Sequence, residues 1–433
     1  MLLTITIIMY RDGLQTCSPN SFQLPRNEGE IVDIVQSSLK YNETVKVVGA
    51  GLSFSGVQLS QGGNMIALDN YNKILNISPQ RNGEALVEVQ AGIMLRDLCL
   101  ELDSYNLALI NLGATATQTI VGAATTGTHG TGASIGAIAT QIESLRIIDA
   151  KGAIHVASAI ENVDLFNAAR VGVGAVGVIS TVTIRAVPQW KMKRYSVPYS
   201  LEALLDGELD ELLAKYDRLQ WSFTPYTDDA TVLIRESVPS STDIYPPGPD
   251  GGCWSETQSI SGEEGCTDVS FKTLTDSYVH YEQRSLYTEM EMFIRIEDSV
   301  QALRDYIAFM DSPAVKNRHD PAVTVSIMLR YVAGDDILIS PMAGRDTAVI
   351  SVIVLGDESA TGPYEEFHMF AKGLEDICQS KYQGRPHWGK VNYATTPYLE
   401  AAYGESYQTF KAIMRRVDPA GMFVNDYIRQ RFF

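Results

Sequence analysis

The sequence predicts a two-part protein in which both parts mix helices and strands. The chain has 433 residues, and a single domain usually holds about 100–200, so two domains are expected. Residues 26–190 alternate between helical and strand-like patterns, whereas residues 191–383 carry longer helical stretches and two strong strand patterns. This change of pattern places the boundary near Pro188.

The elements of the first part follow from apolar periodicity. Apolar side chains recur at helical spacing in 28–39 and 94–102, which predicts two helices. Alternating or β-branched runs predict strands, at 44–48, 85–90, 143–149, 154–157 and 178–186.

In the second part, helices are expected at 201–215 and 300–310, and strands at 323–332 and 347–355. Between them, the segment 237–265 is rich in Pro, Gly and Ser. It is long enough to form an active-site lid or a disordered insertion.

The composition is that of a soluble globular protein, with 45% hydrophobic and 20% charged residues. A net charge of −18 disfavours nucleic acid and anionic membrane surfaces as partners. No apolar run could span a bilayer, so no integral membrane segment is expected. The apolar residues 2–10 lack the flanks of a complete signal peptide, and either a first strand or a truncated leader would explain them. The compartment, cytoplasm or secretory pathway, stays open, as does the occupancy of the glycosylation triplets at Asn42 and Asn76.

The five cysteines show no C-x-x-C spacing, so zinc and thioredoxin-like chemistry have no support and no metal site is expected. Cys253 and Cys266 bracket a Gly/Ser/Glu-rich stretch. A disulfide and two free thiols are equally good interpretations of that pair.

One glycine cluster is misleading. Residues 172–177 read Gly-Val-Gly-Ala-Val-Gly and match the dinucleotide fingerprint letter for letter. That fingerprint needs a strand before it and a helix after it. Here a helical pattern precedes the cluster and a strand pattern follows it, so a Rossmann site is rejected.

Two other clusters point to a ligand. Residues 47–55 place glycines and hydroxyls in a tight loop after a strand, and residues 122–132 are almost devoid of bulky side chains. Small residues let the backbone approach a flat ligand, and successive N–H groups form a nest for anions. Either loop alone would be an ordinary turn, but the two together favour a large cofactor that carries phosphate.

These clusters, with Arg385-Pro386-His387-Trp388-Gly389-Lys390 and Asp418-Pro419-Ala420-Gly421-Met422-Phe423, resemble a known superfamily. The order is similar to that of the vanillyl-alcohol oxidase superfamily, whose FAD-binding domain is called PCMH-type. Within it the chain resembles the sugar-1,4-lactone oxidase and alditol oxidase branch, the group of L-gulonolactone oxidase and L-galactonolactone dehydrogenase. The match runs from about residue 25 to the C-terminus and is weakest between about 195 and 320.

The resemblance implies an α+β fold. It assigns residues 1–190 to a PCMH-type FAD-binding domain and residues 191–384 to a cap domain, an antiparallel sheet flanked by helices. Residues 385–433 would return to the FAD domain. The implied function is an FAD-dependent oxidoreductase that oxidises a hydroxyl of an aldonolactone or alditol by hydride transfer to flavin N5. Oxygen or another electron acceptor would then reoxidise the flavin.

The resemblance also assigns the cofactor-binding residues, which belong to the glycine clusters and their neighbours: Val48, Gly49, Ala50, Gly51, Leu52, Ser53, Phe54, Ser55, Gly113, Ala114, Gly122, Ala123, Thr126, Gly127, Thr128, His129, Gly130, Thr131, Gly132, Gly177, Val178, Ile179 and Lys390. Many relatives link the flavin covalently to a histidine where this chain has Leu52. Leucine has no nucleophile, so non-covalent FAD is expected. His129 is not assigned the linkage, and a structural histidine that bonds to the loop backbone is the favoured interpretation. Thr128 lies in the loop where access of oxygen to the flavin would be decided.

On the substrate side the resemblance assigns catalysis to Arg330, Lys390 and His387. Lys390 and His387 would stabilise the reduced flavin and accept the hydroxyl proton, and Arg330 would bind substrate oxygens. The family segment usually reads Glu-x-Arg, but here the glutamate is Met328. Ser351 stands where alditol-oxidising relatives can carry histidine.

Glu291 is a candidate replacement for the missing carboxylate, with a solvent-facing sheet residue as the equal alternative. The two departures, Met328 and Ser351, motivate a second hypothesis, the oxidation of a less polar alcohol or specialised metabolite. A third hypothesis, from another class, is a non-catalytic flavin- or carbohydrate-binding protein.

Overall fold

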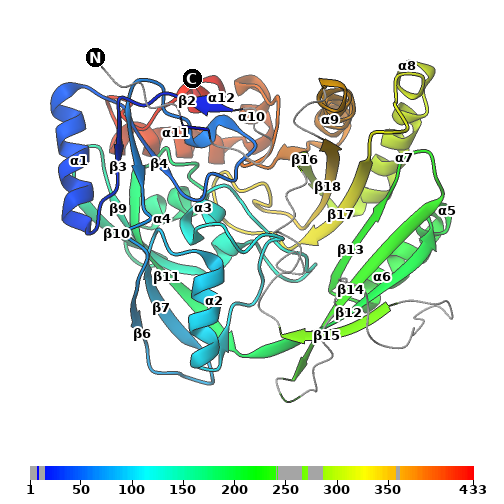
Figure 1. Ribbon diagram of the computed structural model, residues 1–433, viewed down its shortest axis with the longest axis horizontal. Coiled ribbons are helices and arrows are strands. Elements are labelled where there is room, and N and C mark those ends of the chain that lie inside the picture. The colour runs from blue at the N-terminus through cyan, green and yellow to red at the C-terminus, as the bar shows by residue number, and fades with distance from the viewer. Residues whose placement is uncertain (1–6, 9–14, 240, 242–265, 272–285, 357–360) are drawn as a thin grey trace.

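The computed structural model describes residues 7–8, 15–239, 241, 266–271, 286–356 and 361–433. Two halves lie side by side (Figure 1): the N-terminal strands with the C-terminal helices, and a large sheet with its own helices. Most of the predicted loop 237–265 lies outside the described residues. Cys253 does too, and with it the question of a disulfide to Cys266.

The N-terminal half begins with a small parallel sheet and one helix. The sheet has the order β3-β5-β4, with β3 Ser21–Gln23, β4 Val45–Val48 and β5 Asn64–Ala67. The helix α1, Glu28–Tyr41, starts where the Asn27 side chain accepts a hydrogen bond from the Glu30 N–H. It ends where Asn42 adopts the left-handed conformation. The short pair β1, Ile7–Ile8, and β2, Thr16–Cys17, forms a separate two-stranded sheet, whose Cys17 packs against Val48 and Met65 of the parallel sheet.

The second sheet of this half is antiparallel. Its order is β10-β9-β11-β7-β6, with β8 paired to β11. Its strands are β6 Ile74–Ile77, β7 Ala85–Gln90, β8 Leu107–Ala108, β9 Ile142–Ile148, β10 Ile154–Ser158 and β11 Val178–Pro188. The helical segments that connect these strands are η1 Gly56–Gln58, α2 Leu95–Ser104, α3 Ile120–Thr125, η2 Ile138–Gln141 and α4 Val163–Ala169.

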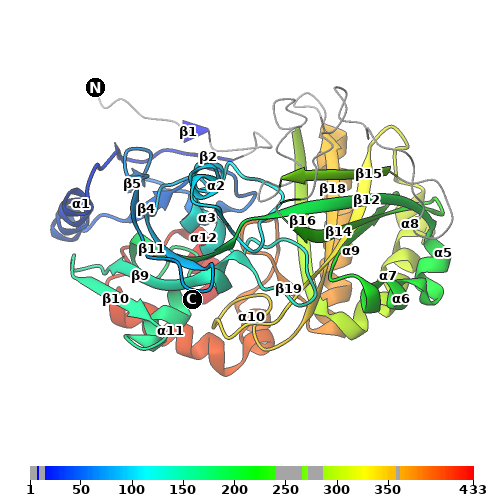
Figure 2. The same cartoon turned by 90° about the horizontal axis from the view of Figure 1, so that it is seen from below.

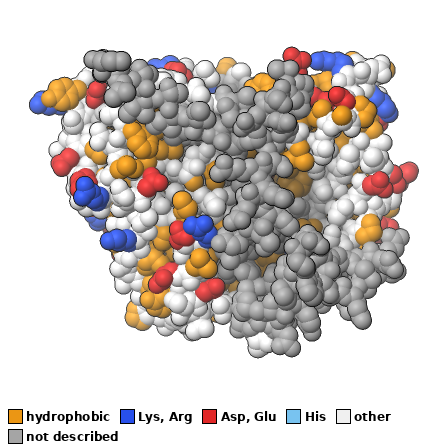
Figure 3. All heavy atoms as spheres, in the orientation of Figure 1, with side chains coloured by type: hydrophobic (Ala, Val, Ile, Leu, Met, Phe, Trp, Pro, Cys, Tyr) orange, Lys and Arg blue, Asp and Glu red, His pale blue; other side chains and the backbone are white. Residues whose placement is uncertain are grey.

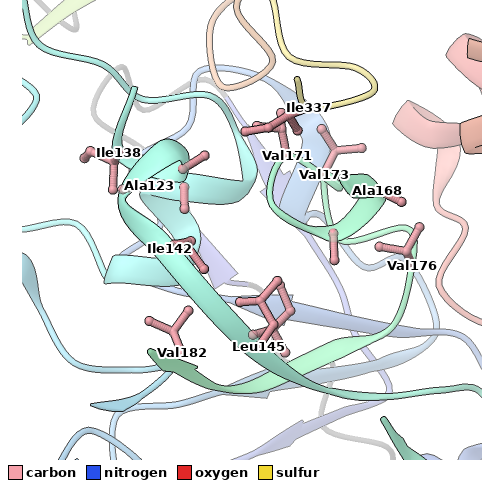
Figure 4. Packing of buried hydrophobic residues seen from close by; sticks show 14 of the residues in the cluster. Ala123, Ile138, Ile142, Leu145, Ala168, Val171, Val173, Val176, Val182 and Ile337 are labelled. Atoms are coloured by element: carbon pink, nitrogen blue, oxygen red, sulfur yellow. The ribbon is translucent and has the colours of Figure 1, made fainter. Parts of the chain in front are cut away.

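The end of the chain shares the core of the N-terminal half. The helices are α10 Thr396–Tyr403, α11 Glu405–Val417 and α12 Asp426–Phe432. Phe410 and Phe432 belong to the same buried cluster as Leu145 of β9 and Val182 of β11. Figure 4 shows part of this cluster, with Ala123 of α3 and the valines of the 172–177 segment packed over the sheet. Burial of this apolar surface holds the tail against the first 190 residues.

The other half is an eight-stranded antiparallel sheet in the order β15-β12-β14-β13-β17-β18-β16-β19. The strands are β12 Trp190–Ser200, β13 Arg218–Phe223, β14 Asp229–Pro239, β15 Cys266–Phe271, β16 Leu286–Arg295, β17 Val325–Val332, β18 Thr347–Gly356 and β19 Arg385–Pro386. Its helices are α5 Leu201–Ala203, η3 Leu204–Glu208, α6 Leu209–Lys215, η5 Ile296–Asp298, α7 Ser299–Met310, α8 Pro313–Lys316 and α9 Thr361–Tyr382.

One face of this sheet is covered and the other is free for a site. Side chains such as Leu329, Ile350 and Met292 pack with α7 and α9 in a second buried cluster (Figure 2). The alternate residues of the same strands therefore point the other way, toward the N-terminal half. We call this second surface the inner face.

The predicted helices and strands are present, with two differences. The predicted helix 201–215 is divided into α5, η3 and α6, because Gly207 has φ +131°, outside the helical region. Several elements were not predicted at all, among them the strands β12, β13, β14 and β16 and the helix α9. The sheets change between β11 and β12, at Gln189, and the domain boundaries at 190 and 384 are a proposal that this arrangement supports.

Two surface properties bear on partners. No helix among the described residues combines the length and the apolar character needed to span a membrane. On the face shown in Figure 3, basic and acidic side chains are interspersed over both halves rather than gathered by sign.

Candidate active site

A cavity lies in the N-terminal half, with about 110 Å³ accessible to the centre of a water molecule. The loop after β4 forms one wall, from Val48 to Ser53. Gly122, Thr126, Gly177 and Ile179, which were also predicted to bind the cofactor, line it as well. We call this space the cofactor cavity.

Close backbone packing explains one of its glycines. A Cβ atom on Gly49 would collide with the Thr119 side chain. Thr119 is also the N-cap of α3, where its oxygen accepts a hydrogen bond from the Gly122 N–H at 3.3 Å. The first glycine loop and the start of the second cluster therefore meet at one threonine, and any larger residue at position 49 would separate them.

The misleading cluster lies between α4 and β11, so the structure confirms the predicted order of helix, cluster and strand. Gly174 and Gly177 have positive φ and line the cofactor cavity, whereas Val176 is buried in the core. The cluster is thus a wall of the cavity without the geometry of a Rossmann turn.

Of the polar side chains of this cavity that were not predicted, two bear on ligand binding. Lys46 is buried, and its Nζ donates to the carbonyls of Gly174 at 3.1 Å and Phe423 at 3.3 Å. Burial lowers the pKa of Lys46 to about 8, partly offset by the charge of Asp418. Gln58 is buried too, and its Nε2 has no hydrogen-bond partner among the described residues.

The cavity fits FAD. Its walls offer backbone amides and small side chains for a large phosphate-bearing molecule, and the orphaned Gln58 amide is a donor that a bound ligand would satisfy. The sequence could have indicated both missed residues only by their closeness to the first glycine loop.

Other predicted cofactor residues lie at the junction of the two halves. The Phe54 N–H donates to Gly389 O at 2.8 Å, and Ser55 Oγ donates to Trp388 O at 2.6 Å. The first glycine loop is therefore bonded directly to the segment that carries His387 and Lys390.

The second glycine segment also reaches the large sheet, since the Gly132 N–H donates to Tyr331 O at 2.8 Å. The rest of this group does not line the cofactor cavity: Gly113, Ala114, Ala123, Gly127, Thr128, His129, Gly130, Thr131, Val178 and Lys390. Of these, Gly113 lies beside Thr128, whose Cγ2 would be 2.6 Å from a Cβ atom added to the glycine. Their roles toward the cofactor stay predictions.

Strand register brings the substrate-side residues onto the inner face. Met328 of β17, Ser351 of β18 and Glu291 of β16 are successive cross-strand partners, so they form one row. Arg330 lies in the next row, beside Gln220. A carboxylate, that of Glu291, therefore lies in the same row as position 328, two strands away.

Glu291 is the centre of a buried polar cluster. Ser351 Oγ donates to its Oε1 at 3.2 Å, and the Nε2 atoms of His129 and His387 lie 3.4 and 3.7 Å from its Oε2. It is 1% exposed, which excludes the solvent-facing alternative. Burial alone would raise the pKa of Glu291, but the charge of Lys390 and the hydrogen bond to His129 lower it well below its usual value.

His387 is a neutral donor in this cluster. Burial lowers its pKa to about 3, so it carries one proton at neutral pH. The Gly389 N–H donates to Nδ1 at 2.9 Å, which leaves that proton on Nε2, facing Glu291.

This tautomer also bears on metal binding. The ligating atoms of His129, Glu291 and His387 come within 4.8 Å of one another. A metal would need an unprotonated His387 Nε2, and the bond from Gly389 opposes that. The cluster is better explained as hydrogen bonds around an anion.

Lys390 links this cluster to the first glycine loop. Its Nζ forms an ion pair with Glu289 Oε2 and lies 5.1 Å from the centre of the Phe54 ring. Burial raises the pKa of Glu289, the charge of Lys390 partly offsets this, and the nearby Glu291 adds to it.

Arg330 stands apart from these carboxylates. Its Nε donates to Gln220 Oε1 at 3.3 Å, and its Nη2 lies 3.6 Å from Met328 Sδ. No carboxylate pairs with it among the described residues. Its remaining donors are therefore available for oxygens of a substrate.

Glu289 is the substrate-side residue that the sequence prediction missed. Residues 286–295 alternate in part between polar and apolar side chains, as in Glu289-Met290-Glu291-Met292. This alternation is typical of a strand with one buried face. It would have placed both glutamates on the same side.

Comparisons with known proteins cover almost the whole chain. The family described as "FAD binding domain" matches residues 19–158, and the family described as D-arabinono-1,4-lactone oxidase matches residues 256–431. L-gulonolactone oxidase of Mus musculus is 30% identical over 440 residues, which cover 96% of each chain. L-gulono-1,4-lactone dehydrogenase of Mycobacterium tuberculosis is 32% identical over 444 residues, covering 96% of this chain and 97% of the relative.

A solved structure shows the same fold. The His121Ala mutant of cholesterol oxidase from Brevibacterium sterolicum superposes with a TM-score of 0.76 and covers 100% of this chain and 98% of that one. Its sequence is only 14% identical, so the likeness concerns the arrangement of the two halves.

Proposed function

Because the chain belongs to the family of L-gulonolactone oxidase and L-gulono-1,4-lactone dehydrogenase, we propose that it oxidises a hydroxyl group of a sugar-derived lactone with FAD as the hydride acceptor. One observation carries the proposal. The loop that forms the cofactor cavity is hydrogen-bonded to the segment of Lys390, which is ion-paired on the inner face of the sheet. Cofactor and substrate sites therefore meet at that segment.

The two halves would divide the work. Bound FAD supplies an acceptor for a hydride from the substrate carbon. Lys390 would stabilise negative charge that develops beside it, and Arg330 would bind and orient the substrate oxygens with its fixed fork of donors. His387 would present its Nε2 proton toward Glu291, whose Oε2 lies 3.7 Å away.

We propose that the FAD is held without a covalent link. Leu52, which lines the cofactor cavity, has no nucleophilic atom. His129 is buried, its Nδ1 lies 2.8 Å from Gly130 O and its Nε2 faces Glu291, so both ring nitrogens are engaged. Acid precipitation should release all of the flavin into the supernatant. Yellow colour that stays in the pellet would contradict this.

A panel of substrates tests the reaction. Sugar lactones, polyols and apolar alcohols are mixed anaerobically with the FAD-loaded protein, and loss of the visible flavin band is followed. Fast bleaching by lactones supports the proposal, and exposure to air then shows whether oxygen is the acceptor. Bleaching by apolar alcohols alone would favour the alternative substrate class, which the Met328 thioether on the inner face supports. Absence of bleaching by every compound would favour a non-catalytic binding protein.

A further inference from the structure

Two glutamates on β16 lie close together but have different hydrogen-bond partners. Glu289 and Glu291 are separated by one residue, so both point to the inner face. Both are buried, 4% and 1% exposed. A buried carboxylate is costly unless its oxygens accept hydrogen bonds, so the partners of each oxygen indicate its role.

Glu291 has both oxygens occupied. Ser351 bonds to Oε1, and the two histidines His129 and His387 face Oε2. It is a fixed anion with no oxygen left over for a substrate.

Glu289 has one oxygen left over. Its Oε2 is paired with Lys390, whereas its Oε1 has no hydrogen-bond partner among the residues that the structure describes. Its cross-strand neighbour on β18 is Ile353, which offers no donor. Oε1 is not fully enclosed, so a donor can reach it from outside, and a substrate hydroxyl group is the donor that the proposed reaction would bring.

The oxygen of Glu289 that has no partner lies near residues that we assign to the cofactor and to the substrate. Lys390, its ion-pair partner, lies against the Phe54 ring of the first glycine loop. Arg330, from two strands away, acts electrostatically on Glu289 without contacting it. By strand register Glu289 is level with Ser326, which is four residues before Arg330. A substrate between Arg330 and Glu289 would therefore lie over the intervening row, which contains Glu291.

We propose that Glu289, through Oε1, accepts the proton of the substrate hydroxyl during oxidation. This rests on the proposed function. In the step, the O–H bond breaks and its proton goes to Glu289 Oε1, while the C–H bond breaks and its hydrogen leaves with the electron pair to FAD. The substrate carbon and oxygen become a carbonyl group, so the substrate is oxidised and the cofactor is reduced by two electrons.

The neighbouring groups are less suited to this task. His387 has Nδ1 occupied by the Gly389 N–H and its proton on Nε2. Glu291 is saturated and its pKa is depressed, whereas burial raises the pKa of Glu289 and makes it a better proton acceptor. Lys390 and Arg330 are cations that face the same region.

The first test is Glu289→Gln in the FAD-loaded protein, mixed anaerobically with L-gulono-1,4-lactone and D-arabinono-1,4-lactone. The flavin reduction rate should fall at least about 100-fold, and its rise with pH should disappear. The matched control is Glu366→Gln, because Glu366 is also buried, 6% exposed, but lies on α9 across the sheet and pairs with His319. The control should reduce at the wild-type rate.

A second measurement does not depend on turnover. Infrared titration of the resting FAD-loaded protein should show the band of a buried protonated carboxyl that is present in wild type and in Glu366→Gln and missing in Glu289→Gln. The band should titrate at the pH where the reduction rate rises. An unchanged rate and pH profile in Glu289→Gln, with FAD still bound, would overturn the proposal. A wild-type protein that no lactone or polyol reduces would instead contradict the proposed function.

Discussion

The cofactor cavity and the inner face of the large sheet are built in different ways. The cavity is lined mainly by residues of three glycine-containing segments, and its only described buried charge is Lys46. The inner face is formed by side chains on rigid strands, with Glu289, Glu291 and Arg330 set by register. The first region is suited to enclosing a large molecule, and the second to placing charges around a small one.

This difference separates what a sequence can show from what it conceals. A site in which the backbone approaches the ligand needs consecutive small residues, and such runs can be recognised in the sequence. A side-chain site depends on which strands become neighbours, and that is decided by contacts between distant segments.

The largest effect on flavin reduction is expected from Lys390→Met. This variant changes the inner face where it meets the first glycine loop. The change removes the positive charge that we expect beside the flavin and leaves Glu289 buried without its partner. The anaerobic flavin reduction rate should fall about 1,000-fold. The control Lys372→Met removes an exposed lysine paired with Asp376, which should have little effect. A Lys390→Met rate within a few-fold of wild type would remove Lys390 from the mechanism.

The next effect concerns the cavity alone. In Gly49→Val the new side chain would collide with Thr119 and push the first loop away from α3. The dissociation constant for FAD, measured by flavin fluorescence, should rise about 100-fold, which corresponds to about 2.7 kcal/mol. Gly29→Ala, on the exposed side of α1, is the control and should bind FAD as wild type does. Unchanged affinity in Gly49→Val would mean that this loop does not hold the cofactor.

These two positions also show how far sequence reasoning reached. Gly49 and Lys390 were both predicted, because a glycine run and the His387–Lys390 segment are local features. Glu289 was missed, since nothing local reveals that β16 lies next to β18. Lys46 was missed because its partners, Gly174 and Phe423, are 128 and 377 residues away. For Glu291 the sequence left two alternatives. Its burial excludes the solvent-facing one, and its role as a replacement carboxylate stays a prediction.

Lys46 allows a further test of the comparison between the cofactor cavity and the inner face, because it is a buried lysine in the cavity. Its pKa is lowered from 10.5 to about 8 by burial, so between those values the unfolded chain binds the proton and the folded chain does not. Stability should therefore rise with pH over this window. The free energy of unfolding of wild type minus that of Lys46→Met should increase by roughly 2 kcal/mol from pH 8 to pH 10. A pH-independent difference in denaturant titrations would show that Lys46 is not neutral in the folded protein.

The smallest effect is expected from Met328→Glu. Met328 Sδ lies 3.6 Å from Arg330 Nη2, so a carboxylate there would lie beside the guanidinium and offer substrate hydroxyls an acceptor. The KM for polyols should fall about tenfold, a change of about 1.4 kcal/mol, while the KM for apolar alcohols should rise. Steady-state kinetics with both substrate types checks this. Equal changes for both types would mean that position 328 does not contact the substrate.

Anaerobic mixing of the FAD-loaded wild-type protein with L-gulono-1,4-lactone or D-arabinono-1,4-lactone tests the central claim most directly. The claim is that the cofactor cavity holds FAD against a charged inner face that oxidises sugar-derived lactones. It predicts complete loss of the visible flavin band with at least one lactone, faster than with any apolar alcohol. A protein that binds FAD and keeps its flavin oxidised with every lactone and polyol would contradict it.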